Sequence, residues 1–491
     1  MIKEYKMNIS KILLTKNLYE NPQRTAFICN DQKLTYKELY KEVLKKAKNM
    51  QCKITDKTVL LILENSLDFV TNTLALWLIG KKIVFINSKL DCEMMNNVIS
   101  KYSNFSILTK EKHKHNINMN RIRENKLFIV QDFENDILEN YEKNFLQTCP
   151  DIKSEFILHT SGSSGIPKGY VHDSNSIFHV CKSYGEKVLN LKKEDVIFSP
   201  FNMSFAYGLG NSLYLPLYYG ATSILSENIN ILDNLKVCEK NNPTIIFGIP
   251  YIYKEIIKIT EKYFVPDLRS VRLFVSAAEK MDIITQKKWY KYFNQNIVES
   301  FGSTELLHVY ISNVKEKNKV DSNGKLLDGY NIKKEYINDK QFELYISGPS
   351  KFKYRIDDGE REKYFNTNDI FEEDSNGYLY FIGRKGTAFK NKGMWVDLKT
   401  VYLKLNQNSL IEYVHVTKKE VKNDFEIRIF LVAKDKTLEQ KIIEKSIRKN
   451  IRELGGMNNL HIEIIFLDSM PRNANDKVNE LKLKDDFIEE S

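Results

Sequence analysis

The chain has 491 residues, of which 42% are hydrophobic and 28% are charged, and its formal net charge at pH 7 is +10. A single hydrophobic core rarely serves so long a chain, so we expect two or more domains. The lysines are spread along the whole length rather than gathered into one basic stripe, which argues against a nucleic-acid-binding protein.

The cysteines and the apolar segments indicate the cellular compartment in which we expect the protein. Six cysteines lie far apart with no CxxC pair, which predicts buried free thiols in a reducing compartment rather than a zinc site. The N-terminus lacks the features of a secretory signal. The most apolar stretch, residues 69–86, is interrupted by Asn72, Lys81 and Lys82 and falls short of a membrane span. We therefore expect a cytoplasmic protein without a membrane segment.

Short apolar runs alternate with helix-length amphipathic segments through the first 300 residues. We predict strands at residues 58–64, 81–87, 196–198, 221–225, 244–247 and 271–275. This alternation is typical of βαβ units, in which helices connect the strands of a mostly parallel sheet.

The pattern changes after residue 313. Charged turns that contain glycine and aspartate separate short strands such as 342–347 and 377–383, and strand and helix alternate again after residue 386, as in 425–434 and 438–454. We predict an α/β protein with two domains. Residues 1–384 would form a large N-terminal domain of mixed, mostly parallel sheets with helices and a β-rich subdomain, and residues 385–491 a small α+β domain.

A loop rich in glycine and serine stands out at residues 159–169, HTSGSSGIPKG, directly after the apolar run 156–158. Backbone N–H groups and small hydroxyls in such a loop can converge on an anion, so the sequence predicts a phosphate-binding loop between a strand and a helix-length segment. The spacing differs from the Walker motif, since Lys168 precedes a glycine rather than a serine or threonine.

The string TSGSSGIPKG resembles the phosphate-binding loop of the adenylate-forming enzymes, the superfamily of acyl-CoA synthetases, non-ribosomal adenylation domains and luciferases. Four further motifs that resemble this family follow in its order: FGSTE (301–305), NTND (366–369), YFIGRKG (380–386) and PRNANDK (471–477). The stretches FAYGLGNSLYLPLYYGAT (205–222) and GSTELLHVYISN (302–313) resemble benzoate-CoA ligases and related aryl-CoA ligases.

The resemblance implies ATP-dependent activation of a benzoate-like acid to an acyl-adenylate with release of pyrophosphate, followed by transfer to a thiol. It implies ATP and Mg²⁺ as cofactors and CoA as the thiol. A carrier-protein phosphopantetheine is the alternative acceptor, and a non-catalytic ligand-binding relative is the alternative from another functional class.

The same resemblance implies a role for each matching residue. Lys477, Thr304 and Glu305 would be catalytic, with Glu305 also binding the metal. The ATP-binding residues would be Thr160, Ser161, Gly162, Ser163, Ser164, Gly165 and Lys168 at the phosphates, Ala278, Glu279, Ser300, Phe301, Gly302 and Ser303 near the adenine, and Asp369 with Arg384 at the ribose.

The acyl group would lie between Phe205, Ala206, Tyr207 and Gly208 on one side and His308 with Val309 on the other. Small residues beside aromatic ones form a flat slot, which suits a ring. A packed, hydrogen-bonded core histidine is the alternative interpretation of His308. Gly393 would line the channel for the thiol.

Several positions depart from the family pattern. Asn368 and Ala278 stand where glycine is usual in the family or in the benzoate enzymes, and Gly386 occupies the hinge position of the small domain. Asp476 directly precedes Lys477, and a neighbouring carboxylate is expected to weaken the contribution of that lysine.

Overall fold

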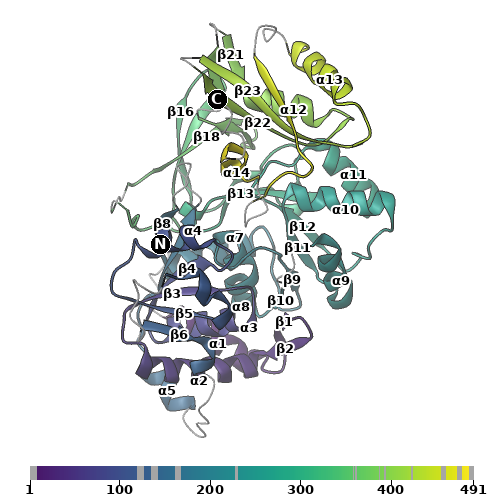
Figure 1. Cartoon of the computed structure of the whole chain (residues 1–491). Coiled ribbons are helices and arrows are strands. Elements are labelled where there is room, and N and C mark those ends of the chain that lie inside the picture. Colours follow the sequence, from purple (N-terminus) through teal and green to yellow (C-terminus); the bar gives the residue numbers. More distant parts are fainter. Residues whose placement is uncertain are drawn as a thin grey trace. The chain divides into compact units, whose positions relative to one another are not determined.

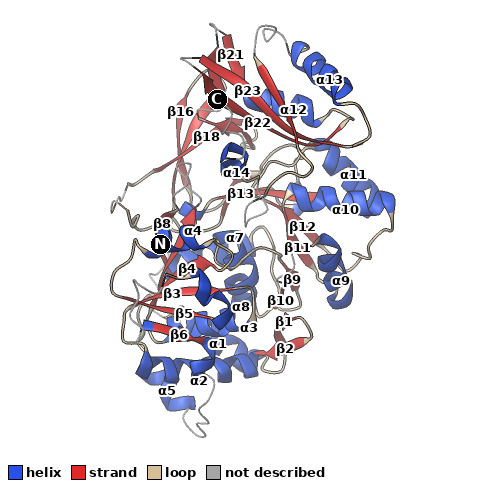
Figure 2. Cartoon of the chain, viewed as in Figure 1, coloured by secondary structure: helices blue, strands red, loops and turns tan. Residues whose placement is uncertain are grey.

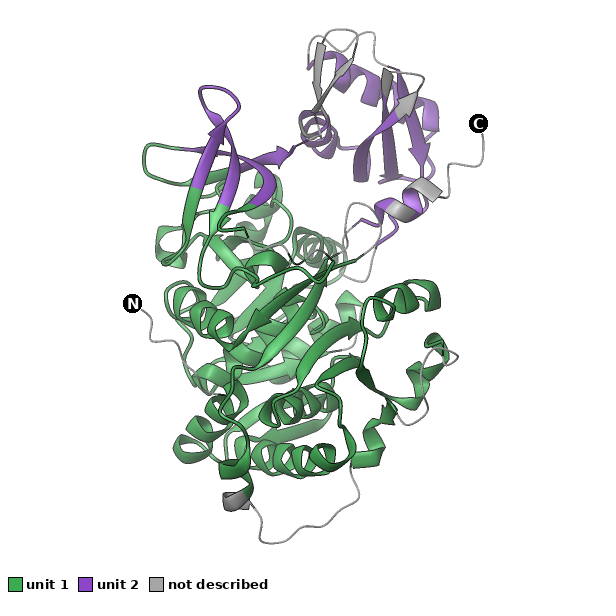
Figure 3. Cartoon of the chain, turned by 90° about the vertical axis from the view of Figure 1, so that its left-hand side faces the viewer, with its two compact units in different colours: residues 1–332, 346–365, 374–380 green, residues 333–345, 366–373, 381–491 purple. Residues whose placement is uncertain are grey.

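The computed structural model describes residues 8–118, 126–133, 142–160, 167–226, 230–357, 359, 362–385, 388–391, 394–421, 424–454, 461–472 and 478–485 (Figure 1). The chain divides into two compact units, coloured separately in Figure 3. Unit 1 comprises residues 1–332, 346–365 and 374–380, and unit 2 comprises residues 333–345, 366–373 and 381–491.

The larger sheet of unit 1 has nine strands in the order β15-β14-β13-β12-β11-β9-β10-β1-β2. The strands from β13 to β1 are parallel, whereas β2, β14 and β15 pair antiparallel with their neighbours. The strands are β1 (Thr25–Cys29), β2 (Gln32–Thr35), β9 (Val196–Phe198), β10 (Thr222–Leu225), β11 (Ile245–Gly248), β12 (Leu273–Ser276), β13 (Ile297–Gly302), β14 (Val309–Ser312) and β15 (Lys325–Leu326).

A second sheet of unit 1 has six strands in the order β6-β5-β3-β4-β7-β8. All neighbours are parallel except β8, which pairs antiparallel with β7. The strands are β3 (Thr58–Leu63), β4 (Lys82–Asn87), β5 (Phe105–Thr109), β6 (Leu127–Ile129), β7 (Glu155–Thr160) and β8 (Lys168–Asp173).

The helices of unit 1 connect these strands, and Figure 2 shows strands and helices alternating along the chain. Local signals set their ends. Helix α2, for example, begins with a capping box in which Thr35 and Glu38 bond each other's backbone N–H groups. The helices are α1 (Ile9–Glu20), α2 (Tyr36–Lys53), α3 (Leu67–Leu78), α4 (Cys92–Ile99), α5 (Glu142–Thr148), α6 (Ser174–Val180), α7 (Ala206–Leu209), α8 (Leu215–Tyr219), α9 (Ile231–Asn241), α10 (Pro250–Lys262) and α11 (Ile283–Phe293).

A four-stranded sheet in the order β16-β17-β18-β19 corresponds to the predicted β-rich subdomain. Its strands are β16 (Asn331–Tyr336), β17 (Gln341–Ser347), β18 (Phe365–Glu373) and β19 (Leu379–Arg384). The predicted strands at 342–347 and 377–383 coincide with β17 and β19.

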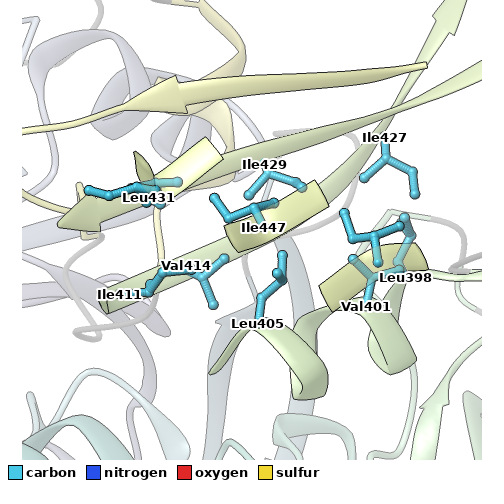
Figure 4. Close-up of a cluster of buried hydrophobic side chains, with 11 residues drawn as sticks. Leu398, Val401, Leu405, Ile411, Val414, Ile427, Ile429, Leu431 and Ile447 are labelled. Atoms are coloured by element: carbon cyan, nitrogen blue, oxygen red, sulfur yellow. The ribbon is translucent and has the colours of Figure 1, made fainter. Parts of the chain in front are cut away.

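The C-terminal part of unit 2 contains its own hydrophobic core. Helix α13 places Ile443, Ile447 and Ile451 on one face, since residues four apart lie one above the other on a helix. They pack with side chains of α12, β22 and β23 (Figure 4). The elements are β20 (Ala388–Asn391), β21 (Met394–Asp397), α12 (Leu398–Asn406), β22 (Ile411–Val421), β23 (Asp424–Ala433), α13 (Gln440–Arg452), β24 (Ile462–Phe466) and α14 (Glu480–Asp485).

The structure confirms the α/β fold class and each strand predicted from the apolar runs. The domain boundary between residues 384 and 385 stays a prediction. Two expectations were wrong. A strand, β8, rather than a helix follows the Gly/Ser loop, because the β-forming Tyr170 and Val171 precede the N-cap Asp173 that starts α6. Cys52 and Cys92 are exposed, whereas the other four free thiols are buried. In the described part of the chain, no helix is both long and apolar enough to cross a membrane.

Ala278 adopts a left-handed backbone conformation with φ of 71°. This region strains alanine and most other residues with a Cβ atom, and glycine enters it without that penalty. We expect Ala278→Gly to raise the free energy of unfolding by about 0.5–1 kcal/mol, measured by urea denaturation. The neighbouring Ala277→Gly, which relieves no such strain, should lower it by a similar amount. Equal effects of the two substitutions would contradict the strain at residue 278.

Candidate functional site

The described ends of the Gly/Ser loop are held in an antiparallel strand pair. Thr160 at the end of β7 pairs with Lys168 at the start of β8. His159 is buried, and burial lowers its pKa to about 4, so its ring is neutral near pH 7. Its Nδ1–H donates to the Phe85 carbonyl at 3.3 Å, and its Nε2 then accepts from the Tyr102 hydroxyl at 2.8 Å.

The far side of the loop is fixed by a lysine. Lys101 Nζ donates to the Pro167 carbonyl at 2.6 Å and forms an ion pair with Asp357 at 2.7 Å. Both ends of the loop are therefore anchored. The predicted phosphate ligands between them lie outside the described residues; these are Ser161, Gly162, Ser163, Ser164 and Gly165.

The FGSTE motif lies where β13 ends and a 3₁₀ turn, η7 (Thr304–Leu306), leads toward β14. A Cβ atom on Gly302 would lie 2.5 Å from the His308 carbonyl oxygen, so only glycine fits there. The Ser303 N–H donates to the same carbonyl at 3.2 Å. These contacts fix the entry and the exit of the turn.

Strand β8 brings the turn next to the Gly/Ser loop. Burial first, and the negative charge of the half-buried Glu305 carboxylate second, raise the pKa of the Tyr170 phenol well above its ordinary value. His172, two residues further along β8, donates from Nε2 to the Thr304 carbonyl at 2.8 Å. Two motifs far apart in the sequence are thus adjacent in unit 1.

Sequence reasoning did not identify Tyr170 and His172. Their spacing of two residues places both side chains on one face of β8, because side chains alternate along a strand. That alternation could have indicated that both face a common partner, but nothing in the sequence names the turn as that partner.

The predicted adenine-contacting segments end neighbouring parallel strands. Ala278 and Glu279 are exposed and follow β12, and residues 300–302 end β13. Because β12 and β13 are parallel, both segments emerge at the same edge of the sheet.

The side chain of Ser300 points into the interior. Its hydroxyl lies 2.8 Å from the Ser312 hydroxyl and 3.4 Å from the Tyr184 hydroxyl. Any contact between Ser300 and an adenine would therefore be made by the backbone of Ser300 and not by its side chain. Phe301 packs edge-to-face against Tyr310 at 5.7 Å between ring centroids.

The predicted acyl-binding residues come together at the start of α7. Phe205 directly precedes the helix, and the buried Ala206 begins it. The Tyr207 ring lies 5.6 Å from the His308 ring. A Cβ on Gly208 would lie 2.2 Å from the Asn202 carbonyl oxygen, so glycine is required for this close approach.

His308 is enclosed by aromatic rings and is 2% exposed. Its ring centroid lies 5.2 Å from that of Tyr184 and 6.3 Å from that of Tyr214. Burial lowers its pKa to about 3, so the imidazole is neutral at pH 7. The packing agrees with a core histidine, but neither ring nitrogen has a hydrogen-bond partner among the described residues, so a hydrogen-bonded core histidine is not what the structure shows. The acyl-binding roles of His308 and of Val309, which is buried in β14, stay predictions.

The predicted ribose-binding pair lies within unit 2. Arg384 Nε donates to the buried Asp369 carboxylate at 2.8 Å. Asn368 adopts φ of 56°, the left-handed conformation that asparagine tolerates better than most residues. The usual glycine conformation is therefore accessible despite the substitution. The remaining predicted positions lie outside the described residues; these are Gly386, Gly393, Asp476 and Lys477.

The described residues fit a magnesium ion that arrives with the nucleotide. They contain no group of three or more His, Cys, Asp or Glu side chains that could hold a metal by themselves. Mg²⁺ is commonly bound through one or two carboxylates together with substrate phosphates. Glu305, half-buried beside the anchored loop, offers a suitable carboxylate.

Comparison with solved structures shows the same fold. The anthranilate CoA ligase AuaEII in complex with anthranoyl-AMP superimposes with a TM-score of 0.84 at 21% identity, over 98% of this chain and 97% of that one. A benzoate CoA ligase from Burkholderia xenovorans LB400 gives a TM-score of 0.81 at 20% identity, over 97% and 99%.

Comparison of sequences finds curated aryl-CoA ligases. Benzoate–CoA ligase of Thauera aromatica is 26% identical over 344 residues, which cover 67% of this chain and 65% of that enzyme. Anthranilate–CoA ligase of Pseudomonas aeruginosa is 30% identical over 258 residues, covering 49% of this chain and 48% of that enzyme. The chain thus matches less than two thirds of the length of these relatives. The sequence model described as AMP-binding enzyme matches residues 14–353, so the chain belongs to the AMP-binding enzyme family.

Proposed function

We propose that the protein is an AMP-forming acid–thiol ligase that activates an aromatic carboxylic acid with ATP and transfers the acyl group to CoA. The observation that carries the proposal is the contact between β8, which follows the Gly/Ser loop, and the Thr304–Leu306 turn. The curated relatives named above, whose names specify benzoate and anthranilate, support an aromatic acid.

In the first step a carboxylate oxygen of the acid attacks the α-phosphorus of ATP, and the bond to the leaving pyrophosphate breaks. The nucleophile belongs to the substrate, so the chain supplies positioning and charge neutralisation rather than a nucleophilic residue. The loop residues Thr160 to Gly165 and Lys168 would bind the phosphates, with Thr304 at the α-phosphate. Mg²⁺ bound with the nucleotide would neutralise phosphate charge, and Glu305 would hold it.

In the second step the thiol attacks the acyl carbon, the thioester bond forms and AMP leaves with the electrons of the broken C–O bond. CoA is the proposed acceptor, in line with the names of the relatives. A carrier-protein phosphopantetheine would present the same thiol. Gly393 is the residue proposed to line its path.

The adenine and ribose contacts complete the proposal. The edge formed by residues 278–279 and 300–303 would receive the base. Asp369 would accept hydrogen bonds from the ribose hydroxyls, with Arg384 holding the carboxylate. The acid would lie between the start of α7 and the segment that carries His308 and Val309.

The acyl assignment predicts the substrate class. Benzoate, with or without hydroxyl or amino groups, should be used in preference to acetate and to a long-chain fatty acid. Ala206→Phe should raise KM for the aryl acid about tenfold or more by overpacking the slot, and should leave KM for ATP unchanged. Steady-state AMP release measures both constants. A preference for fatty acid, or unchanged aryl turnover in the variant, would refute the assignment.

The metal assignment predicts the effect of Glu305→Gln, which keeps the size of the side chain and removes its charge. Adenylation should fall by about 10²–10³ in rate, with partial recovery at high Mg²⁺, because the lost ligand stabilises phosphate charge. Pyrophosphate exchange into ATP measures this step. Glu316→Gln, an exposed control in the same unit, should be neutral. Full activity of Glu305→Gln at ordinary Mg²⁺ would exclude the role.

The role of Lys477 predicts that the two half-reactions separate. Lys477→Ala should slow formation of the acyl-adenylate by about 10²–10³. Given synthetic acyl-adenylate, the same variant should still form thioester at nearly the wild-type rate. Lys482→Ala, an exposed control in α14, should affect neither step. Equal losses in both steps for Lys477→Ala would mean a structural role, and no loss in either would remove the lysine from the mechanism.

A further inference from the structure

Two side chains from outside the Thr304–Leu306 turn bind its carbonyl groups. The Thr304 carbonyl accepts from His172 Nε2 at 2.8 Å. The Leu306 carbonyl accepts from the Ser350 hydroxyl at 2.7 Å. Both donor side chains are fully buried, so water does not compete for either donor.

The Glu305 carbonyl, between those of Thr304 and Leu306, also accepts a hydrogen bond. The backbone N–H of Phe352 donates to the Glu305 carbonyl at 2.8 Å. Three successive carbonyls of the turn therefore each receive a donor from another segment of unit 1. A turn bonded in this way has little freedom to rotate its peptide groups, and the directions of the Thr304 and Glu305 side chains follow from those peptide groups.

The backbone at the end of the turn is strained. Leu307 adopts φ of 65° and ψ of −34°, which is a genuine outlier for a bulky residue. Such strain persists only where the surrounding structure over-determines the conformation, and it concentrates at functional sites. The hydrogen-bond donors to the carbonyls of residues 304–306 are the surrounding groups that hold Leu307 in this conformation.

His172 is the donor whose chemistry is most constrained. Its ring is 0% exposed and stacks on Phe156, with 5.8 Å between centroids and an interplanar angle of 28°. Burial lowers its pKa to about 4, so the ring carries a single N–H at pH 7. A carbonyl oxygen can only accept, so that proton is on Nε2.

His172 lies on the strand that directly follows the phosphate loop. It lies on β8, four residues after Lys168 and two after Tyr170, whose phenol pKa is raised by burial and by the nearby Glu305 carboxylate. Strand β8 thus pairs with the end of β7 beside the phosphate loop and, further along, binds the backbone of the turn.

We propose that His172 is a positioning residue, whose Nε2–H fixes the Thr304 carbonyl and thereby holds Thr304 and Glu305 in the orientation that receives the magnesium–nucleotide complex. The inference rests on the proposed function for the identity of that ligand. It assigns to His172 no contact with the reacting atoms.

The test compares three variants of the full chain. His172→Leu removes the donor at similar volume, and His172→Gln restores an N–H at about the reach of Nε2. Tyr36→Phe is the matched control, because it deletes another buried donor to a backbone carbonyl, Tyr36 to Ala221 at 2.7 Å. The measurement is binding of the non-hydrolysable analogue α,β-methylene-ATP by titration calorimetry, with and without Mg²⁺, beside the pyrophosphate exchange rate.

We expect His172→Leu to need about tenfold more Mg²⁺ for half-maximal analogue binding, with affinity in the absence of Mg²⁺ within about twofold of wild type. His172→Gln should recover most of this shift, and Tyr36→Phe should show none. If His172→Leu does not fold, Ser350→Ala removes the other side-chain donor to the turn, and it should shift the Mg²⁺ requirement in the same direction while His172→Gln stays near wild type.

Three results would overturn the inference. The first is an equal loss of affinity with and without Mg²⁺, and the second is an equal Mg²⁺ shift in Tyr36→Phe; either means a general structural role. The third is an unchanged Mg²⁺ requirement in a folded His172→Leu. The proposed function fails separately, when the wild-type protein itself binds no analogue and exchanges no pyrophosphate.

Discussion

The contact between β8 and the Thr304–Leu306 turn joins the two sheets of unit 1. Strand β8 is the antiparallel edge of the six-stranded sheet, and the turn follows β13 of the nine-stranded sheet. A buried, neutral histidine suits this junction, because a charged ring would be costly to bury and a shorter polar side chain would not span the gap. The relative placement of the phosphate loop and Glu305 depends on this junction.

The sequence predicted the parallel strands well because each is a short run of β-branched and aromatic residues between helical segments. The runs at 58–64 and 81–87, for example, became β3 and β4 with shifts of a single residue at an end. The prediction failed directly after the Gly/Ser loop, where KGYVHD forms β8. Polar residues at both ends of this six-residue segment conceal its short apolar centre, and the pairing with β7 is a tertiary contact that no local pattern reveals.

The candidate site was predictable where a motif is local and not where it depends on long-range contacts. The resemblance located FGSTE and FAYGLG, and the structure brings FAYGLG against His308. Tyr170, His172 and Ser350 were missed because each acts through a residue more than 40 positions away. The positive φ of Leu307 could not be predicted either, because a leucine in a sequence does not indicate a left-handed backbone.

Two departures from the family pattern acquire a common explanation. Ala278 and Asn368 stand at positions where the resemblance leads us to expect glycine, and both adopt the left-handed conformation that glycine favours. The conformation expected of a glycine is thus present at both positions. The left-handed conformation costs asparagine little free energy and costs alanine more. Asn368 and Ala278 therefore differ in their effect on stability rather than on the path of the chain.

The most direct test of the central claim is carboxylate-dependent exchange of radiolabelled pyrophosphate into ATP. It reports reversible acyl-adenylate formation without any assumption about the thiol acceptor. The account predicts exchange that requires Mg²⁺ and an aromatic acid and is much weaker with acetate or a fatty acid. A protein that binds ATP but catalyses no exchange with any acid would contradict the account and support a ligand-binding relative.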